Sequence, residues 1–347
     1  MTSSPATTIA TTPRGGKRAL PRPVLLALGT AALALAAAAG LMLGSSTISA
    51  PRVMSALSAF NGSAEQVTVV DVRLPRVVVA AVVGASLGVA GALMQSITRN
   101  PLAEPSLLGV SWGAALAAVG AQVVAGIDTA TALVPVAIGG AAAAGLVVVV
   151  LGATGRTGLT PERLIVAGAA VSGLLAALVQ GLLVLDRESL EVARRWLAGS
   201  LNGAGWDGLG AAAPYFLAGA LLTVFLVRPL STLALGENVA RGLGVRTTLI
   251  KATAALAIVA LAGGSVALAG PIILVGLVVP HAAGVLVGRD LAPLLIACGV
   301  LGALLVVVSD IVARIVVAPE ELPVGVMTAL VGAPVLLHVA RRGVASA

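Results

Sequence analysis

The chain has 347 residues, of which 59% are hydrophobic and 10% are charged, and its mean hydropathy is +1.08. Soluble domains carry about 25% charged residues, so the composition excludes a water-soluble globule. The net charge of +7 does not indicate nucleic-acid binding, because Lys and Arg are spread along the whole chain without an aromatic-interleaved cluster. A membrane protein with basic cytoplasmic loops accounts for the same composition.

Several kinds of reactive site are absent from the sequence. Cys298 is the only cysteine, which excludes a disulfide scaffold, and His281 and His338 each lack a second ligand at metal spacing. There is no GxxxxGK[ST] loop, so we expect the chain to hydrolyse no ATP and to bind no cofactor itself. No carboxylate cluster suggests an enzyme, and no carboxylate lies mid-span, as a proton- or Na⁺-coupled carrier would often require. After these exclusions, the remaining class of membrane protein is a pore or permease that is driven by another protein.

Charge-free runs locate the membrane spans, because charges are costly in a bilayer and a span needs about 20 apolar residues. Residues 1–22 are rich in Ser, Thr, Pro and Arg and are expected to form a disordered cytoplasmic tail. The charge-free runs that follow are 23–51, 77–98, 105–127, 129–155, 164–185, 208–227, 252–288, 291–309 and 322–340.

The run 252–288 is too long for one span. As a single helix it would measure roughly 55 Å, against a membrane core of about 30 Å. It contains Gly263-Gly264 and Gly270-Pro271, which predict a break. Dividing this run gives an all-α integral membrane protein with ten transmembrane helices. The run 53–64 is too short to span and is expected at the membrane interface.

Charge asymmetry sets the expected topology. Ten spans place both termini on one side of the membrane, and both tails are basic, which predicts that both are cytoplasmic. In this arrangement the cytoplasmic side carries twice as many basic residues as the outside.

Polar residues mark two of the expected helices. Thr160-Pro161-Glu162 has the features of a helix start: a hydroxyl N-cap, a proline in the first turn and an acid at the positive end of the dipole. In the helix that follows, Ser172, Ala176 and Gln180 recur every four residues and form a small polar stripe. Such a stripe is typical either of helix–helix packing or of a pathway lining.

Two further segments have both a structural and a functional interpretation. The loop 228–251 is expected to carry two short amphipathic helices on the cytoplasmic surface, which would be either an ordinary solvated loop or a docking platform for a partner. Asp310 and Arg314 are four residues apart near the outer end of a span and can pair on one helix face.

Four long strings carry a resemblance to a known family. They are RLPRVVVAAVVGASLGVAGALMQSITRNPLAEPSLLGVSWGA at 73–114, LALGENVARGLGV at 233–245, LAGPIILVGLVVPH at 268–281 and SDIVARIVVAPEELPVGVMTALVGAP at 309–334. In this order they closely resemble the FecCD family, the ABC-importer permeases for iron–siderophore complexes, haem and vitamin B12. The resemblance covers residues 23–342, the expected permease domain, and leaves a short tail at 343–347.

The resemblance implies a vitamin B12 importer permease-like fold with ten helices per subunit. It also implies a second permease subunit with the translocation path between the two, two cytoplasmic ATPase subunits that hold ATP and Mg, and an extracytoplasmic substrate-binding protein. No nucleic acid is expected as a partner.

The resemblance also assigns roles to residues of this chain. The ATPase-coupling residues would be Leu235, Gly236, Glu237, Ala240, Arg241 and Gly244. Thr160, Pro161 and Glu162 would lie at the cytoplasmic gate, and Ser172, Ala176 and Gln180 would line the path. Arg73, Arg76 and Arg314 would receive acidic residues of the binding protein, with Asp310 orienting Arg314.

The sequence departs from the family pattern at two positions: Gly284 stands where the family usually has Arg, and Leu274 where it has an aromatic residue. The function that we expect is that of a permease subunit in the cytoplasmic membrane, moving a ferric siderophore by alternating access driven by a separate ATPase. A haem or cobalamin permease of the same family, or a secondary carrier working alone, is the alternative. The sequence leaves open whether the two permease subunits are identical.

Overall fold

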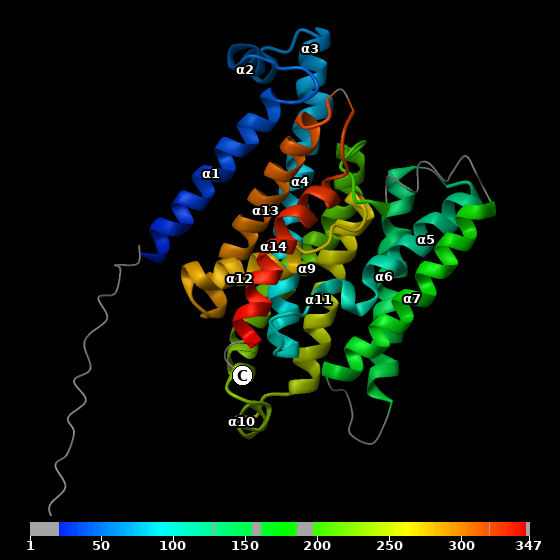
Figure 1. Ribbon diagram of the computed structural model, residues 1–347, viewed down its shortest axis with the longest axis vertical. Helices are drawn as coiled ribbons and strands as arrows, with labels where there is room; N and C mark the ends of the chain where they lie inside the picture. Colours follow the sequence, from blue (N-terminus) through cyan, green and yellow to red (C-terminus); the bar gives the residue numbers. More distant parts are fainter. Residues whose placement is uncertain (1–20, 128, 155–160, 186–196, 319, 345–347) are drawn as a thin grey trace, which may run out of the picture.

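The computed structural model describes residues 21–127, 129–154, 161–185, 197–318 and 320–344, and these residues form helices and connecting turns (Figure 1). The α-helices in chain order are α1 (Arg22–Met42), α2 (Ala50–Ser58), α3 (Ala64–Val67), α4 (Leu74–Thr98), α5 (Val110–Ala125), α6 (Ala130–Ala153), α7 (Pro161–Leu185), α9 (Trp206–Ala234), α10 (Glu237–Gly242), α11 (Thr247–Ala269), α12 (Val275–Val287), α13 (Leu291–Ile315) and α14 (Val324–Val344). A π-helical turn at Thr68–Arg73 precedes α4, and a 3-10 turn at Pro105–Leu108 precedes α5.

The long helices follow the charge-free runs of the sequence. In the described part of the chain, seven helices are long and apolar enough to cross a membrane, and α5, α12 and the first part of α14 are shorter apolar helices. Each expected span contains one of these helices, so the all-α membrane architecture is confirmed. The count of ten transmembrane spans stays a prediction, because α12 with 13 residues is only about 20 Å long and crosses no full bilayer by itself.

The long run 252–288 is divided between two helices, α11 and α12, as predicted. Residues 270–274 interrupt the helix, as Gly270-Pro271 predicts, whereas Gly263 and Gly264 lie inside α11. A Cβ at Gly263 would lie 3.1 Å from Cβ of Ala141, and one at Gly264 would lie 3.1 Å from the Phe216 ring. This glycine pair therefore lets α6 and α9 pack closely on α11 instead of ending the helix.

The expected loop 228–251 is shorter than predicted. Helix α9 continues through Pro229 to Ala234, because Leu230 and Leu233 remain buried in the core and hold its last turns in place. The segment then carries one short helix, α10, where the sequence suggested two. Helix α11 already begins at Thr247.

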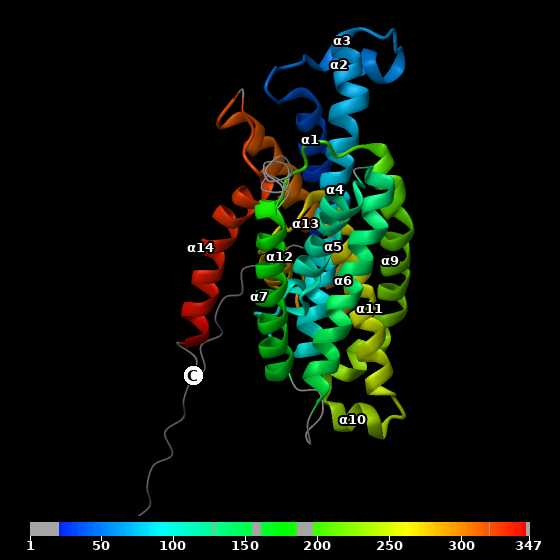
Figure 2. The same ribbon diagram turned by 90° about the vertical axis from the view of Figure 1, so that its right-hand side faces the viewer.

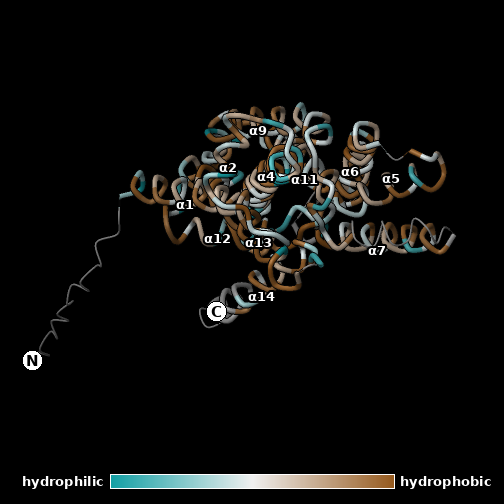
Figure 3. Tube along the Cα trace, turned by 90° about the horizontal axis from the view of Figure 1, so that it is seen from above, coloured by the Kyte–Doolittle hydropathy of each residue, from teal (hydrophilic) through white to brown (hydrophobic). Residues whose placement is uncertain are grey.

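The two ends of the bundle carry different short helices. Helices α2 and α3 lie at one end and α10 at the opposite end in both views (Figures 1 and 2). Helix α4 lies in the middle, where it packs against α11, α12 and α13, and α7 lies at the rim beside α5 and α6 (Figure 3). Helix α14 packs mainly on α13 and α12 and leans away from the other helices (Figure 2).

Close backbone contacts fix α4 in this central place. A Cβ at Gly84 would lie 2.2 Å from the carbonyl oxygen of Gly302 in α13, and one at Gly91 would lie 1.9 Å from the carbonyl oxygen of Gly276 in α12. No side chain fits at either position, so the helices touch through their backbones, as small residues permit in membrane proteins.

We predict that Gly91→Ala lowers the thermal unfolding midpoint of the purified protein in detergent, because the new methyl must push α12 away from α4. Overpacking of this kind costs about 1–3 kcal/mol. Gly139→Ala in α6 is the matched control, since its Cβ would meet no heavy atom within 4 Å. Equal midpoints for the two variants would contradict the close contact.

Candidate functional site

The carboxylate of Glu237 fastens α10 to the start of α11. Its Oε1 accepts hydrogen bonds from Arg241 Nη2 at 2.8 Å and from the Thr247 hydroxyl at 3.3 Å, and its Oε2 accepts one from Lys251 Nζ at 2.9 Å. The Lys251 hydrogen bond, helped by the charges of Lys251 and Arg241, lowers the pKa of Glu237. The carboxylate therefore stays ionised at neutral pH, and these bonds weaken only when the pH falls through that lowered value.

The other predicted coupling residues shape the same segment. Ala240 is fully buried and seats α10 on the bundle. Gly236 and Gly244 have φ of +125° and +80° and bracket the helix with turns that other residues rarely adopt. The structure thus brings together the predicted set Leu235, Gly236, Glu237, Ala240, Arg241 and Gly244 on one short helix and its two flanking turns.

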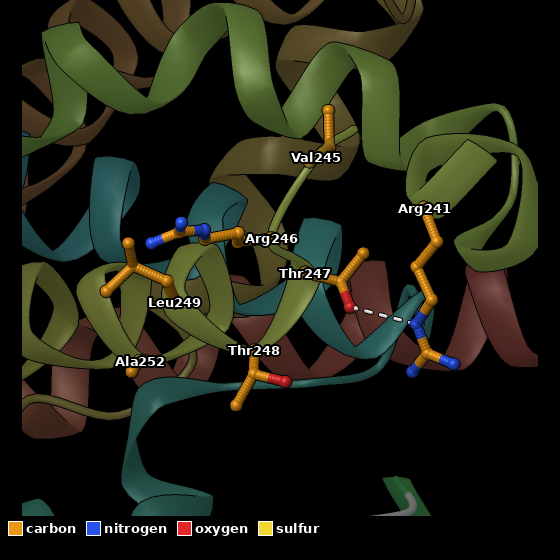
Figure 4. A pocket seen from close by; sticks show the side chains of 7 residues that line it. All are labelled: Arg241, Val245, Arg246, Thr247, Thr248, Leu249 and Ala252. Atoms are coloured by element: carbon orange, nitrogen blue, oxygen red, sulfur yellow. Dashed lines mark hydrogen bonds between the residues drawn. The ribbon is translucent and has the colours of Figure 1, made fainter. Parts of the chain in front are cut away.

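An exposed apolar surface lies on this segment, and of its residues the sequence analysis named only Leu235. Leu235, Val239 and Leu243 are 68%, 50% and 64% exposed. Their spacing of four residues is the sequence signal that could have identified them. Beside them lies a pocket of about 590 Å³ lined by Arg241, Val245, Arg246, Thr247, Thr248, Leu249 and Ala252 (Figure 4). Exposed leucines next to arginines at the end of a helix bundle are typical of a protein-binding surface.

The predicted gate and pathway residues belong to α7. The helix begins at Pro161, as the sequence predicts, while Thr160 and the side chains of Pro161 and Glu162 lie outside the described part of the chain. Val179 and Leu183 pack against α5, whereas Ser172 and Ala176 are partly exposed and Gln180 is exposed. The polar stripe therefore points away from the packed interior of this chain.

A cluster of charges is buried near the α2–α3 end of the bundle. Arg76 of α4 donates to Asp310 Oδ1 of α13 through Nε at 3.0 Å and Nη2 at 2.8 Å, and to Glu321 through Nη1 at 2.8 Å. Arg314 Nη2 lies 3.0 Å from Asp310 Oδ2, and Arg314 Nη1 donates to the Gly40 carbonyl at 3.2 Å. Arg76, Asp310 and Arg314 are 6%, 1% and 3% exposed.

Arg73 is also buried, and it holds the end of α1. Its guanidinium donates to the carbonyls of Leu41, Met42 and Ser46 at 3.0, 2.9 and 2.6 Å. The three arginines predicted to dock a binding protein thus have partners within this chain. Asp310 does more than orient Arg314, because it also pairs with Arg76. The docking role remains a prediction.

Glu104 is a further carboxylate, and the sequence reasoning passed over it. It lies in the turn between α4 and α5 and accepts a hydrogen bond of 2.7 Å from the backbone N–H of Leu274, where α12 begins. Burial raises the pKa of Glu104, against the opposing effect of this hydrogen bond and of the Ser106 hydroxyl. The signal in the sequence was a lone acid beside a proline within a long apolar stretch.

We predict that Asp310→Ala destabilises the protein by about 3–5 kcal/mol, because it leaves buried arginines without their shared partner. Glu65→Ala breaks the exposed ion pair with Arg52 and should cost less than about 1 kcal/mol. Unfolding of both variants in mixed detergent micelles measures the difference. Similar losses would mean that the buried cluster contributes no more than a surface pair.

The chain is similar in sequence to proteins of a known family. A model of the FecCD transport family matches residues 21–342. The "Probable siderophore transport system permease protein YfiZ" of Bacillus subtilis is 45% identical, covering 84% of this chain and 88% of its own length. The ferric enterobactin transport system permease protein FepD of Escherichia coli is 39% identical, covering 94% of this chain and 96% of its own.

A solved structure agrees with the sequence relatives. It is described as an inward-facing conformation of a metal-chelate type ABC transporter, and it has a TM-score of 0.81 and 29% identity, covering 92% of this chain and 99% of its own. The family model spans nearly the whole chain, and the relatives match it at well over 30% identity along most of their length. The chain therefore belongs to the FecCD transport family, whose members are multi-pass membrane permeases of ABC importers.

Proposed function

We propose that this chain is the permease subunit through which a ferric siderophore crosses the cytoplasmic membrane. Two permease subunits would enclose the path, two ATPase subunits would supply ATP and Mg, and an extracytoplasmic binding protein would deliver the cargo. The names of the relatives YfiZ and FepD support a siderophore as the cargo. This chain itself would bind no cofactor and hydrolyse no ATP.

The observation that carries the proposal is the surface of α10. Three exposed apolar side chains on and beside a short helix, next to two exposed arginines, form a compact contact surface at one end of the bundle. The Glu237 hydrogen bonds to Thr247 and Lys251 attach this helix to α11. A push on α10 would therefore be delivered to a long, well-buried helix of the bundle and not to a free loop.

This role fixes the orientation that we propose. The α10 end faces the ATPase in the cytoplasm, and the α2–α3 end faces outward. Both termini are then cytoplasmic, in agreement with their basic residues. The exposed stripe Ser172, Ala176 and Gln180 on α7 would face the second permease subunit and line the path, with the gate at residues 160–162.

We predict that Val239→Asp together with Leu243→Asp abolishes co-purification of the ATPase, because the charges replace the apolar part of the docking surface. Leu57→Asp on α2 is the control, since the same change at the opposite end should leave the ATPase bound. An ATPase that still co-purifies with the double variant would contradict the assignment of α10.

A second prediction separates binding from coupling. Glu237→Ala should keep the ATPase bound but uncouple ATP hydrolysis from uptake, because α10 loses its hydrogen bonds to Thr247 and Lys251 of α11. The measurement compares uptake of ferric siderophore, haem and cobalamin with phosphate release in proteoliposomes that contain the whole complex. Normal uptake by the variant would refute the coupling role, and uptake of haem or cobalamin alone would refute the siderophore assignment.

A further inference from the structure

The segment 270–274 is irregular, partly buried backbone within the helix bundle. It connects α11 to α12, and Ile272 and the first residues of α12 are buried. Backbone N–H groups in such a place need acceptors, because neither lipid nor water supplies them. The first turn of α12 also lacks intrahelical partners for its N–H groups, as every helix start does.

Glu104 supplies one of these acceptors from a distant part of the sequence. Its carboxylate binds the Leu274 N–H at 2.7 Å, where Leu274 has a φ of +69°. A leucine rarely adopts this left-handed conformation, and surrounding contacts must hold it there. A carboxylate at the positive end of α12 also interacts favourably with the helix dipole.

The start of α12 is held on two further sides. A Cβ at Gly276 would lie 2.8 Å from Cδ of Pro105, the neighbour of Glu104, and the Gly276 carbonyl lies against Gly91 of α4. Gln95 of α4 donates to the Leu277 carbonyl at 3.4 Å. The turn after α4 and α4 itself thus fix α12, while Arg99 at the start of the same turn donates to the Leu233 carbonyl at the end of α9.

Leu274 also forms the contact between this segment and α14. A Cβ at Gly332 of α14 would lie 2.7 Å from Cβ of Leu274. Next to this contact, an open apolar groove of about 480 Å³ lies on α12, α13 and α14, lined among others by Val279, Leu305, Val312, Met327 and Val331. Leu274 therefore packs directly on α14, beside this apolar groove.

We infer that Glu104 is a positioning residue for transport, which holds Leu274 in its left-handed conformation and thereby sets the position of α14. Through Arg99 the same turn reaches the end of α9, directly before α10. A movement of the coupling segment would reach α14 along this route. The inference uses the proposed importer function for its transport readout, but its structural readout does not depend on that function.

The structural experiment measures the position of α14 in the purified chain. Cys298 is replaced by Ala, and spin labels are attached to cysteines at Leu286 of α12 and Leu337 of α14, both exposed side chains. Glu104→Ala should broaden the distance distribution between the labels, and Glu104→Gln, which keeps an acceptor of the same reach, should leave it narrow. Leu102→Ala, an exposed side chain on the same turn, is the control and should also leave it narrow.

A second variant covers the case in which Glu104→Ala fails to fold. Glu104→Asp keeps the charge but shortens the reach, so it should broaden the distribution while Glu104→Gln does not. The reverse ranking, or a narrow distribution in both Glu104→Ala and Glu104→Asp, would overturn the inference.

The transport experiment uses the complete complex in proteoliposomes with ferric siderophore. We expect cargo moved per ATP to fall roughly tenfold in Glu104→Asp, the effect of one lost buried hydrogen bond, and to stay within about twofold of the parent in Glu104→Gln. An unchanged ratio in Glu104→Asp would overturn the positioning role. If no variant transports, including the parent, the proposed cargo or function is wrong, and the spin-label result alone decides the role of Glu104.

Discussion

The fold depends on direct backbone contact between α4 and its neighbours. Gly84 faces Gly302, and Gly91 faces Gly276, at distances that exclude any side chain. In a bilayer the hydrophobic effect does not drive helices together, so van der Waals contact at such close approach must do much of this work. Once α4 is fixed in this way, the positions of α12 and α13 are fixed as well, and the charge cluster and the α12 start can form.

Polar interactions then secure the places where helices end or break. Arg73 binds the carbonyls at the end of α1, Arg99 binds a carbonyl at the end of α9, and Glu104 binds an N–H at the start of α12. Each is an ionisable side chain from a distant segment that hydrogen-bonds to a backbone group at a helix terminus. The scarce charges of this chain are therefore placed where a membrane protein cannot leave backbone groups unpaired.

Much of the architecture could be predicted from the sequence. The long apolar helices follow from the spacing of charges, and the break at Gly270-Pro271 follows from residues that cannot continue a helix. The interpretation of Gly263-Gly264 was wrong because a glycine pair serves a break and a close helix contact equally well, and only the neighbours Ala141 and Phe216 distinguish the two. The pairing of Arg314 with Asp310 follows from their spacing of four residues, whereas the partners of Arg73 and Arg76 were hidden, since they lie far away in the chain.

The candidate site was also predictable only in part. The pattern around Glu237 predicted a surface helix, but its attachment to Lys251 depends on how α10 folds back on α11. Glu104 gave a weak signal, because the residue that it holds is separated from it by 170 positions.

The pairing of Arg76 with Asp310 joins residues that are 234 positions apart. During synthesis the chain is made from its N-terminus, so α4 enters the membrane long before α13 exists. Arg76 must remain without this partner while most of the helices are inserted, and the cluster is complete only once α13 and the following Glu321 have been made. Assembly of the central helices is therefore a late event, and a truncated chain that ends before Asp310 would retain an uncompensated arginine and be open to quality control.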